Sequence, residues 1–408
     1  MDNKMKITDK IICALVTLMI MSFYLFEMNS WGRYVFFAIS VLVAILYAVT
    51  NNMKFNLRIT SFHKYIFMFS LFCLMSAVWS WNSSLAISKG ITILSILICF
   101  SLIYPYYEKQ NNIESLLLSF MFSGYGICIY MIYYYGVDGI LGMLSGGVRL
   151  GNDFTNANAI GLLAATSCII QYFFYQQNKY RITAIFVIPA IIALAISQSR
   201  KATIMIVIGV IALALTSGSG KKSFKKYFHI LFGLILIGVM FYGLAKMDMF
   251  SGVMNRFKTL FESMNGTRYE DIRSIYRRLG MQQFYKTPIF GIGMGNSLEL
   301  LSSLGERRTY LHCNFVEILA SGGIIGFIVY YAIYYKIAKN LIKYKRFRIS
   351  SNLCLVLITL MILMDYGMVT YYDKQQYLYF MCFFLQIDFL KNDAKKSIKV
   401  INEERRIS

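Results

Sequence analysis

Long apolar runs recur along the whole chain and leave little room for a soluble fold. Each run is close to the roughly 20 residues that a helix needs to cross the hydrocarbon core of a bilayer. Charged residues make up only 15% of the 408 residues and 57% are hydrophobic, whereas a soluble domain carries about 25% charged residues. The pattern therefore predicts an all-α polytopic membrane protein.

About twelve transmembrane helices are expected, joined mostly by short connections. They are placed near 11–26, 34–49, 65–79, 91–107, 116–136, 158–175, 182–197, 203–217, 228–245, 315–335, 353–372 and 376–390. The first two runs follow each other with no cleavage site between them, which favours an uncleaved first span over a signal peptide.

Basic residues gather in alternate connections and set the expected orientation. Lysine-rich segments lie before the first span, at 54–64, 179–181, 221–226 and 336–348, and after 391. Because short, positively charged loops stay in the cytoplasm, we expect both termini on the cytoplasmic side. This anchoring explains most of the net charge of +21, so no nucleic-acid partner is expected.

The predicted organisation has four parts. Transmembrane helices 1–9 occupy 1–245, an extracytoplasmic (periplasmic) loop occupies 246–314, transmembrane helices 10–12 occupy 315–390, and a cytoplasmic basic tail occupies 391–408. A connection as long as the loop is usually functional or disordered.

A helix is expected inside this loop. From 269 to 284 the apolar residues Ile272, Ile275, Tyr276 and Leu279 recur at the spacing of one helix face. We therefore expect an amphipathic helix that folds over the outer membrane face, and a large helical extracytoplasmic loop as a whole.

Arginine dominates the expected outer side. Seven of the ten basic residues between Leu244 and Asn314 are arginine, namely Arg256, Arg268, Arg273, Arg277, Arg278, Arg307 and Arg308. A guanidinium meets phosphate oxygens through two parallel hydrogen bonds and keeps its charge at any relevant pH. The functional interpretation is a phosphate-bearing ligand. The alternative is a solvated helix whose arginines pair with Glu270 and Asp271.

Two other outer connections carry cations. Arg200 and Lys201 lie in the S-Q-S-R-K-A turn at 197–202, between two closely spaced spans. Charges near membrane depth are costly and often functional, although these two could also reach out to lipid headgroups. Arg149 lies in G-G-V-R-L-G-N-D-F-T-N, among glycines and amides, where the alternative is an ordinary turn before the next span.

The segment T-P-I-F-G-I-G-M-G-N at 287–296 is not a dinucleotide-binding fingerprint, because Asn296 stands where a third glycine is needed. We expect a turn whose glycines let the backbone approach a ligand or another helix, or a purely structural turn.

His312 is the only one of the three histidines on the expected outer side. An imidazole titrates near neutral pH and suits a general base; the alternative is a histidine that only marks the interface. A metal site would need clustered ligands, and seven of the eight cysteines lie in apolar runs, so no metal or other cofactor is expected. Asp365, inside a span, is expected to pair with an outer arginine or to orient His312.

Taken in order and spacing, three segments resemble the O-antigen ligase and polymerase superfamily of bacterial surface-polysaccharide assembly. They are S-Q-S-R at 197–200, R-R-L-G-M-Q-Q-F-Y-K-T-P-I-F-G-I-G-M-G at 277–295 and H-C-N-F-V-E-I-L-A-S-G-G at 312–323. The resemblance covers roughly residues 145–335. It implies a GT-C-like, inverting, metal-independent glycosyltransferase in the bacterial inner membrane, with an undecaprenyl-pyrophosphate-linked glycan as donor.

The resemblance also implies roles for single residues. Arg200 and an arginine of the outer loop, Arg277 or Arg278, would hold the pyrophosphate. Lys201 and Arg273 are further candidates, and Arg149 matches less securely. His312 would accept the proton of the attacking sugar hydroxyl, with Glu317 or Asn314 orienting it.

Several functions fit this resemblance. A polymerase, in the Wzy-type O-antigen or capsule pathways, adds the growing glycan to another lipid-linked repeat unit, and a chain-length regulator is then a candidate partner. A ligase transfers the glycan to lipid A core. We favour the polymerase, because the chain is lysine-rich, has small loops and lacks a distinctive acceptor feature. A flippase, a transporter or another lipid-linked transferase is less favoured, because the charges gather on one face instead of through the spans.

Overall fold

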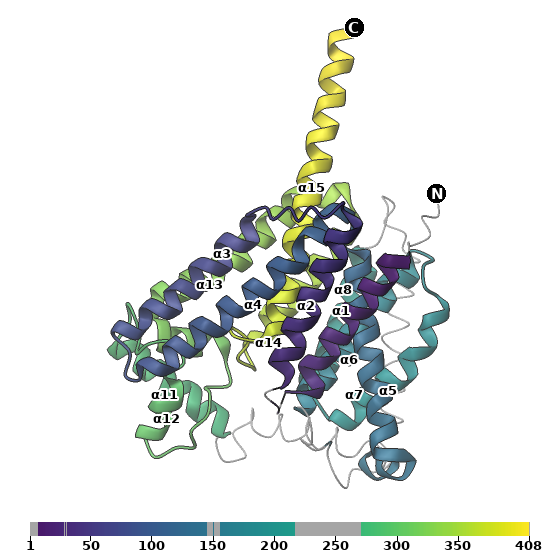
Figure 1. The fold of residues 1–408 in the computed structure, drawn as a ribbon. Coiled ribbons are helices and arrows are strands. Elements are labelled where there is room, and N and C mark those ends of the chain that lie inside the picture. Colours follow the sequence, from purple (N-terminus) through teal and green to yellow (C-terminus); the bar gives the residue numbers. More distant parts are fainter. Residues whose placement is uncertain are drawn as a thin grey trace. The chain divides into compact units, whose positions relative to one another are not determined.

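The computed structural model describes residues 7–27, 29, 31–144, 150, 156–216 and 271–407. Within these ranges every regular element is a helix and no strand occurs (Figure 1). Seven helices are long and apolar enough to cross a membrane, and two shorter apolar helices span Ile182–Ser197 and Ser350–Asp365. The prediction of an all-α, multi-pass membrane protein is confirmed for the described part of the chain.

Helices lie at eleven of the twelve predicted span positions. The span predicted at 228–245, and the residues 246–270 of the predicted loop, lie outside the described residues. The number of twelve spans therefore stays a prediction.

The chain divides into two compact units. Unit 1 comprises 1–36 and 114–269, and unit 2 comprises 37–113 and 270–408. Helix α2, Trp31–Thr50, crosses the boundary between them. The helices of unit 1 are α1 (Ile7–Leu25), α5 (Glu114–Leu144), α6 (Ala157–Gln176), the 3-10 helix η2 (Ile182–Phe186), α7 (Val187–Ser197) and α8 (Arg200–Thr216).

In unit 1, α6 is the central helix and packs against α5, α7 and α8. Small residues allow this close packing, as is common between membrane helices. A Cβ at Gly124 would overlap the Ser167 hydroxyl, and a Cβ at Gly161 would lie 2.6 Å from the Ser197 hydroxyl. Gly161 thus lets α6 approach the tight turn that joins α7 to α8.

Unit 2 contains the described helices of the predicted loop, together with helices that come before and after it in the chain. They are α3 (Ser61–Met75), η1 (Ser76–Val78), α4 (Ser83–Gln110), α11 (Ile272–Lys286), α12 (Ser297–Ser303), α13 (Asn314–Tyr344), η4 (Lys345–Phe347), α14 (Ser350–Asp365) and α15 (Lys374–Ile407). Helix α13 packs against α3, α11, α14 and α15. Buried aromatic rings fill the space between them, among them Phe69, Tyr330 and Phe380.

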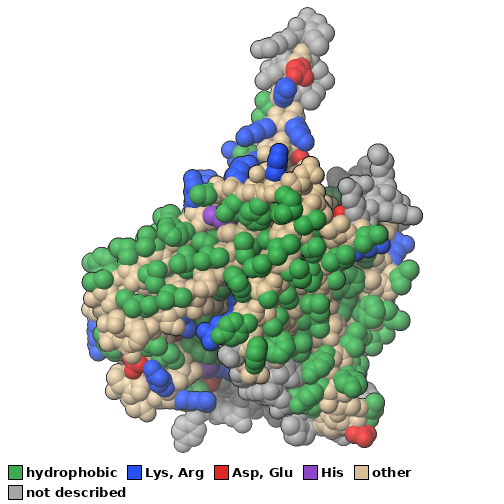
Figure 2. Space-filling model, in the orientation of Figure 1, with side chains coloured by type: hydrophobic (Ala, Val, Ile, Leu, Met, Phe, Trp, Pro, Cys, Tyr) green, Lys and Arg blue, Asp and Glu red, His purple; other side chains and the backbone are tan. Residues whose placement is uncertain are grey.

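The two ends of unit 2 differ in character (Figure 1). We call the end with α11, α12 and the first turns of α4 and α13 the loop end. The opposite end, with the first turn of α3 and the C-terminal half of α15, is the tail end. Lysine and arginine side chains gather around α15 where it leaves the bundle, whereas hydrophobic side chains cover much of the face below it (Figure 2).

One predicted boundary was wrong. The span expected at 353–372 ends at Asp365, because the Asp365 carboxylate accepts a hydrogen bond of 2.6 Å from the Thr370 hydroxyl and the chain turns there. Helix α15 covers the span predicted at 376–390 and continues to Ile407. The predicted basic tail is therefore helical, with Lys399 and Glu403 paired one turn apart at 3.7 Å.

Candidate active site

The glycine-rich segment 287–296 ties three parts of unit 2 together at the loop end. Gly291, Gly293 and Gly295 have φ of +66°, +94° and +81°, which side-chain-bearing residues rarely adopt. The backbone of Ile292 donates to the Ala320 carbonyl of α13 at 3.1 Å and accepts from the Trp81 N–H at 3.2 Å. Of the alternatives left open by the sequence, the approach to another helix is therefore what the glycines permit.

Asn296 fixes the end of this segment. Its side chain is fully buried; it accepts from the Asn82 N–H at 2.8 Å and donates to the Ser80 hydroxyl at 2.6 Å. Trp79 adds a hydrogen bond from its indole N–H to the Phe290 carbonyl at 3.0 Å. Asn296 thus joins the glycine-rich segment to the start of α4.

His312 lies in the short connection between α12 and α13, with an unusual backbone conformation. Its φ is +58°, in the left-handed region that non-glycine residues seldom occupy and that often marks a functional position. The imidazole lies parallel to the Tyr276 ring of α11, with centroids 6.2 Å apart, and 4.4 Å from the Tyr310 ring centroid. The ring is half-buried.

Glu317 holds the segment that carries His312. Its side chain is 2% exposed, accepts the Leu311 N–H at 2.9 Å and accepts the Ser297 hydroxyl at the start of α12. A buried carboxylate that loses a donor leaves an unsatisfied charge, which is expensive. Glu317 therefore locks the backbone beside His312 and does not hydrogen-bond the imidazole itself.

Asn314 acts in the same indirect way. Its amide donates to the Asp365 carboxylate and to the Tyr331 hydroxyl, both at 3.2 Å, and its oxygen accepts the N–H groups of Thr370 and Tyr371. The amide is therefore saturated by bonds that join α13 to the turn after α14.

Asp365 is the centre of this buried network. Besides Asn314 and Thr370, it accepts from the hydroxyls of Tyr331 and Tyr334, each at 3.1 Å. The predicted pairing with an outer arginine is not seen among the described residues, because the hydrogen bonds of Asp365 come from neutral donors of α13 and of its own turn. The network fixes the position of the first turns of α13 and hence of His312.

Helix α11 brings arginines to this segment. It packs on residues 311–316 through Gly280, where a Cβ would lie 2.6 Å from Leu311 and 2.7 Å from Val316. The predicted amphipathic helix is confirmed, but its buried face is Tyr276, Gly280 and Gln283. Ile272, expected on that face, is 52% exposed, because the closest approach occurs at Gly280 and turns the first residue outward.

The side chains of Arg273 and Arg277 are half-buried on α11, and that of Arg278 is exposed. The Arg277 guanidinium lies 5.2 Å from the centroid of the Tyr366 ring and interacts electrostatically with Cys313, the neighbour of His312. Neither Arg273 nor Arg277 forms an ion pair with a described carboxylate. Asp271, considered as a partner, instead caps the helix by accepting the Arg273 N–H.

A cleft of about 530 Å³ opens between the start of α4 and helix α12. It is lined by Trp81, Asn82, Ser83, Glu299, Ser302 and Ser303. The Trp81 side chain is 53% exposed. Arg308 donates to Glu299 at 2.7 Å and holds the pKa of that carboxyl below its usual range, so Glu299 stays ionised and accepts from the Asn82 amide. The cleft thus offers one aromatic surface among hydrogen-bonding groups.

Residues 184–331 match the sequence model of the family described as O-antigen ligase. This match supports the resemblance of this part of the chain to the O-antigen ligase and polymerase superfamily. The matched segment includes α7, α8, α11, α12 and the first half of α13, and so contains both Arg200 and His312. A glycosyltransferase-like function of the ligase or polymerase type follows. No curated protein matches the chain.

Arg200 and Lys201 are the first residues of α8 in unit 1. Cations at a helix N-terminus face the positive end of the helix dipole, an arrangement that an anion would relieve. The preceding turn is rigid: Ser197 and Ser199 are buried, and Gln198 has a φ of +47°. Arg149 lies outside the described residues.

Sequence reasoning missed Lys89. This residue lies in the second turn of α4, its ammonium nitrogen is 3.4 Å from the Tyr372 ring centroid, and it attracts Glu317 electrostatically. Its stem passes Gly295, where a Cβ would lie 3.0 Å from it. A signal was present, because a lysine in a connection expected to be extracytoplasmic violates the positive-inside pattern.

Proposed function

We propose that this protein is a bacterial surface-polysaccharide polymerase. It joins undecaprenyl-pyrophosphate-linked oligosaccharide repeat units at the outer face of the inner membrane, by inverting glycosyl transfer. The observation that carries the proposal is the arrangement at His312. His312 has a half-buried imidazole and a left-handed backbone. Buried Glu317 accepts the N–H of the preceding residue Leu311, and the adjacent helix α11 carries two arginines, Arg273 and Arg277, that no described carboxylate neutralises.

The reaction has one bond-forming and one bond-breaking event. A hydroxyl oxygen of the acceptor repeat unit attacks the anomeric carbon of the donor glycan from the face opposite the pyrophosphate. The bond between that carbon and the pyrophosphate oxygen breaks, and undecaprenyl pyrophosphate leaves with the electron pair. His312 takes the proton of the attacking hydroxyl. Proton removal by a positioned base contributes roughly 10²–10⁴-fold to a rate.

The arginines stabilise the leaving group. Negative charge grows on the pyrophosphate oxygens as the bond breaks, and fixed cations aimed at that charge lower the barrier without reorganisation. We assign this role to Arg277, with Arg273 beside it, and Arg278 as the outward-facing alternative. Arg200 and Lys201 are assigned to phosphate binding on the separate argument of the α8 N-terminus. With cations in these places, the proposed reaction requires no metal ion or cofactor.

The cleft at Trp81 supports a glycan substrate. A sugar ring has a face of C–H groups that stacks on an aromatic side chain and hydroxyls at its rim that need polar partners. Trp81 offers the first and Asn82, Ser83 and Glu299 the second. A chain of contacts joins the cleft to the His312 segment, because Glu299 lies on α12 and the first residue of that helix, Ser297, bonds Glu317.

A ligase that passes the glycan to lipid A core is the second candidate, and it uses the same residues. The polymerase is favoured by the absence, in the described residues, of an additional acceptor domain beyond the small cleft. A lipid-linked oligosaccharide flippase or transporter is less favoured, because the buried carboxylates of the described residues, Asp365 and Glu317, are both engaged in hydrogen-bond networks at one end of unit 2.

The surface glycan of a deletion strain tests the proposal. Loss of the protein should leave single repeat units in place of long chains, and expression of the wild-type protein should restore the ladder of lengths. Complete chains that remain on the lipid carrier would identify a ligase. Accumulation of lipid-linked units on the cytoplasmic side would identify a flippase and would reject the glycosyl-transfer proposal.

A purified system sharpens this test. Full-length protein in liposomes with lipid-linked repeat units should release undecaprenyl pyrophosphate and form longer glycans, with equal rates in the presence and absence of a metal chelator. A reaction abolished by chelation, and restored by a divalent cation, would contradict the metal-independent mechanism.

A further inference from the structure

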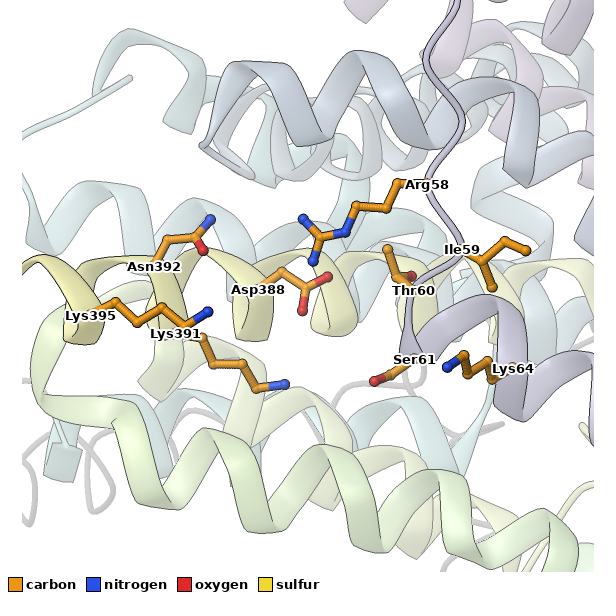
Figure 3. A pocket seen from close by; sticks show the side chains of 9 residues that line it. All are labelled: Arg58, Ile59, Thr60, Ser61, Lys64, Asp388, Lys391, Asn392 and Lys395. Atoms are coloured by element: carbon orange, nitrogen blue, oxygen red, sulfur yellow. The ribbon is translucent and has the colours of Figure 1, made fainter.

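A second charged cavity lies at the tail end of unit 2, at the opposite end of α3 and α13 from His312 (Figures 1 and 3). Its volume is about 210 Å³. Two segments build it: residues 58–64, which lead into α3, and residues 388–395 of α15. Segments more than 300 residues apart in the chain therefore meet around one space.

Four cations line this cavity, namely Arg58, Lys64, Lys391 and Lys395. The only carboxylate in the lining is Asp388, which leaves a net charge of +3. Figure 3 shows the Arg58 guanidinium turned toward Asp388, with the Lys391 and Lys64 side chains on the other side of the space.

Asp388 does not neutralise this set. It accepts a hydrogen bond of 3.1 Å from the Tyr104 hydroxyl and attracts Arg58 and Lys391. Arg58 also pairs with Glu108 at 3.5 Å. Lys64, Lys391 and Lys395 form no ion pair with any described carboxylate. The acidic partners thus hold Arg58 in place, and three ammonium groups are left to a ligand.

Neutral donors complete the site. Thr60 and Ser61 contribute hydroxyls to the lining, and Ser61 is the first residue of α3. The positive end of the helix dipole favours an anion at the start of α3. Thr60 and His63 form a capping box there: the Thr60 side chain accepts the His63 N–H, and the His63 Nδ1 accepts the Thr60 N–H at 3.2 Å.

Ordinary anchoring of lysines at a membrane surface explains positive charge, but not this arrangement. Anchoring needs charges near the headgroups and is indifferent to which residues supply them. Here the cations converge from two segments on a space bounded by hydroxyls and a helix N-terminus. Phosphate oxygens are the acceptors that such a set of donors fits.

We propose that this cavity binds a phosphate group, independently of the glycosyl-transfer site. The group comes from an anionic phospholipid headgroup at the membrane surface or from free phosphate, and both present the same oxygens to the cavity. Helix α15 connects the cavity to the Asp365 network, because its residue Gln376 donates a hydrogen bond to the Tyr334 hydroxyl, which in turn donates to Asp365. Phosphate bound in the cavity therefore also stabilises the described fold of unit 2.

A matched pair of double variants on α15 tests this proposal. Lys391→Gln with Lys395→Gln removes two cations from the cavity. Lys396→Gln with Lys399→Gln removes the same charge from exposed positions of the same helix that do not line it. The full-length protein is reconstituted in nanodiscs of phosphatidylcholine with increasing phosphatidylglycerol. Retained lipid is counted by native mass spectrometry, and thermal unfolding is measured alongside.

The cavity pair should weaken phosphatidylglycerol binding roughly tenfold or more, since it removes two of the four cations that converge on the bound phosphate. The control pair should change it less than about threefold on the same scale. Inorganic phosphate, added to protein in neutral detergent, distinguishes the sources. Stabilisation of the wild type by phosphate alone identifies free phosphate as the ligand, and stabilisation by phosphatidylglycerol but not by phosphate identifies the headgroup.

Two results would overturn the proposal. One is equal loss of binding in the cavity pair and the control pair, which would show only bulk charge. The other is the lack of stabilisation of the wild type by either phosphate source. If the cavity pair does not fold, Lys395→Gln alone is compared with its neighbour Lys396→Gln in the same assays.

Discussion

At the scale of single residues, His312 combines two properties that mutagenesis can separate. Its backbone is left-handed, with a φ of +58°, and its side chain is the proposed base. Asparagine tolerates the left-handed region better than other residues that bear a Cβ, but it has no basic nitrogen. The variant His312→Asn therefore removes the base with little added backbone strain, whereas His312→Ala adds strain as well.

We predict that His312→Asn unfolds at the wild-type temperature and loses roughly 10²–10⁴-fold in the rate of glycan extension. His312→Ala should lose the same activity and be less stable. The measurements are thermal unfolding in detergent and polymer length in a complemented deletion strain. Normal chain lengths with His312→Asn would remove the base assignment.

Arg277 lies against the Tyr366 ring and interacts electrostatically with Cys313, the neighbour of His312. We predict that Arg277→Gln lowers the extension rate by roughly 10²-fold, because one preorganised donor to a developing negative charge is lost. Arg277→Lys should be intermediate, since it keeps the charge and loses the planar fork. Initial rates at several donor concentrations measure both effects.

Arg307→Gln is the matched control for this pair. It removes one arginine from the same loop, and Arg307 is exposed. Its rate should stay within about twofold of the wild type, as expected for an exposed charge. Equal losses in Arg277→Gln and Arg307→Gln would mean that the loop acts through its total charge and not through a placed guanidinium.

At the scale of elements, the glycine-rich segment 287–296 positions the start of α4 against α13. Gly291 and Gly305 have similar φ, +66° and +76°. A Cβ at Gly291 would overlap the Ser321 backbone, whereas a Cβ at Gly305 would meet nothing within 4 Å. The two positions thus separate the cost of the conformation from the cost of the contact.

We predict that Gly305→Ala lowers the free energy of unfolding by about 1–2 kcal/mol, the cost of placing a side chain in the left-handed region. Gly291→Ala should lower it by at least about 1 kcal/mol more, since backbone atoms must move, and should also reduce activity. Thermal unfolding of both variants checks this. Equal destabilisation would show that the segment packs less tightly against α13 than the structure indicates.

The sequence predicted elements better than the contacts between them. Apolar runs of the length of a bilayer located helices at eleven positions, because span length and hydropathy are local properties. The face that α11 buries was misjudged at Ile272, because Gly280 has no side chain to signal a contact. Asp365 accepts hydrogen bonds from the hydroxyls of Tyr331, Tyr334 and Thr370. The sequence did not predict the tyrosine partners, because a tyrosine inside an apolar span is counted as a hydrophobic residue.

The candidate site was predicted by residue type but not by geometry. His312 and the arginines stood out because few polar groups share their side of the predicted topology. Lys89 was overlooked although its place in an outer connection was a signal, because its contact with Tyr372 depends on the fold. Glu317 was predicted as an orienting group. Its hydrogen bonds to Leu311 and Ser297 could not be predicted, because they depend on how the chain folds around α12 and not on a local sequence pattern.

At the scale of the whole molecule, the proposed reaction requires the loop end of unit 2 to face outward. Cysteine labelling can test this, because all eight native cysteines are buried. Cys313, the one nearest His312, reacts slowly for a second reason: burial raises the pKa of its thiol, so little thiolate is present at neutral pH. Arg307→Cys and Lys396→Cys place one exposed thiol at the loop end and one at the tail end.

We predict that a membrane-impermeant maleimide labels Arg307→Cys in intact spheroplasts and labels Lys396→Cys only after permeabilisation. The unsubstituted chain measures the background from native cysteines. Because lysine-rich segments stay in the cytoplasm, the tail end with Lys391, Lys395 and Lys399 should be shielded. Labelling of Lys396→Cys in intact spheroplasts, with Arg307→Cys protected, would put His312 on the cytoplasmic side, where a base for polymerisation at the outer face has no substrate.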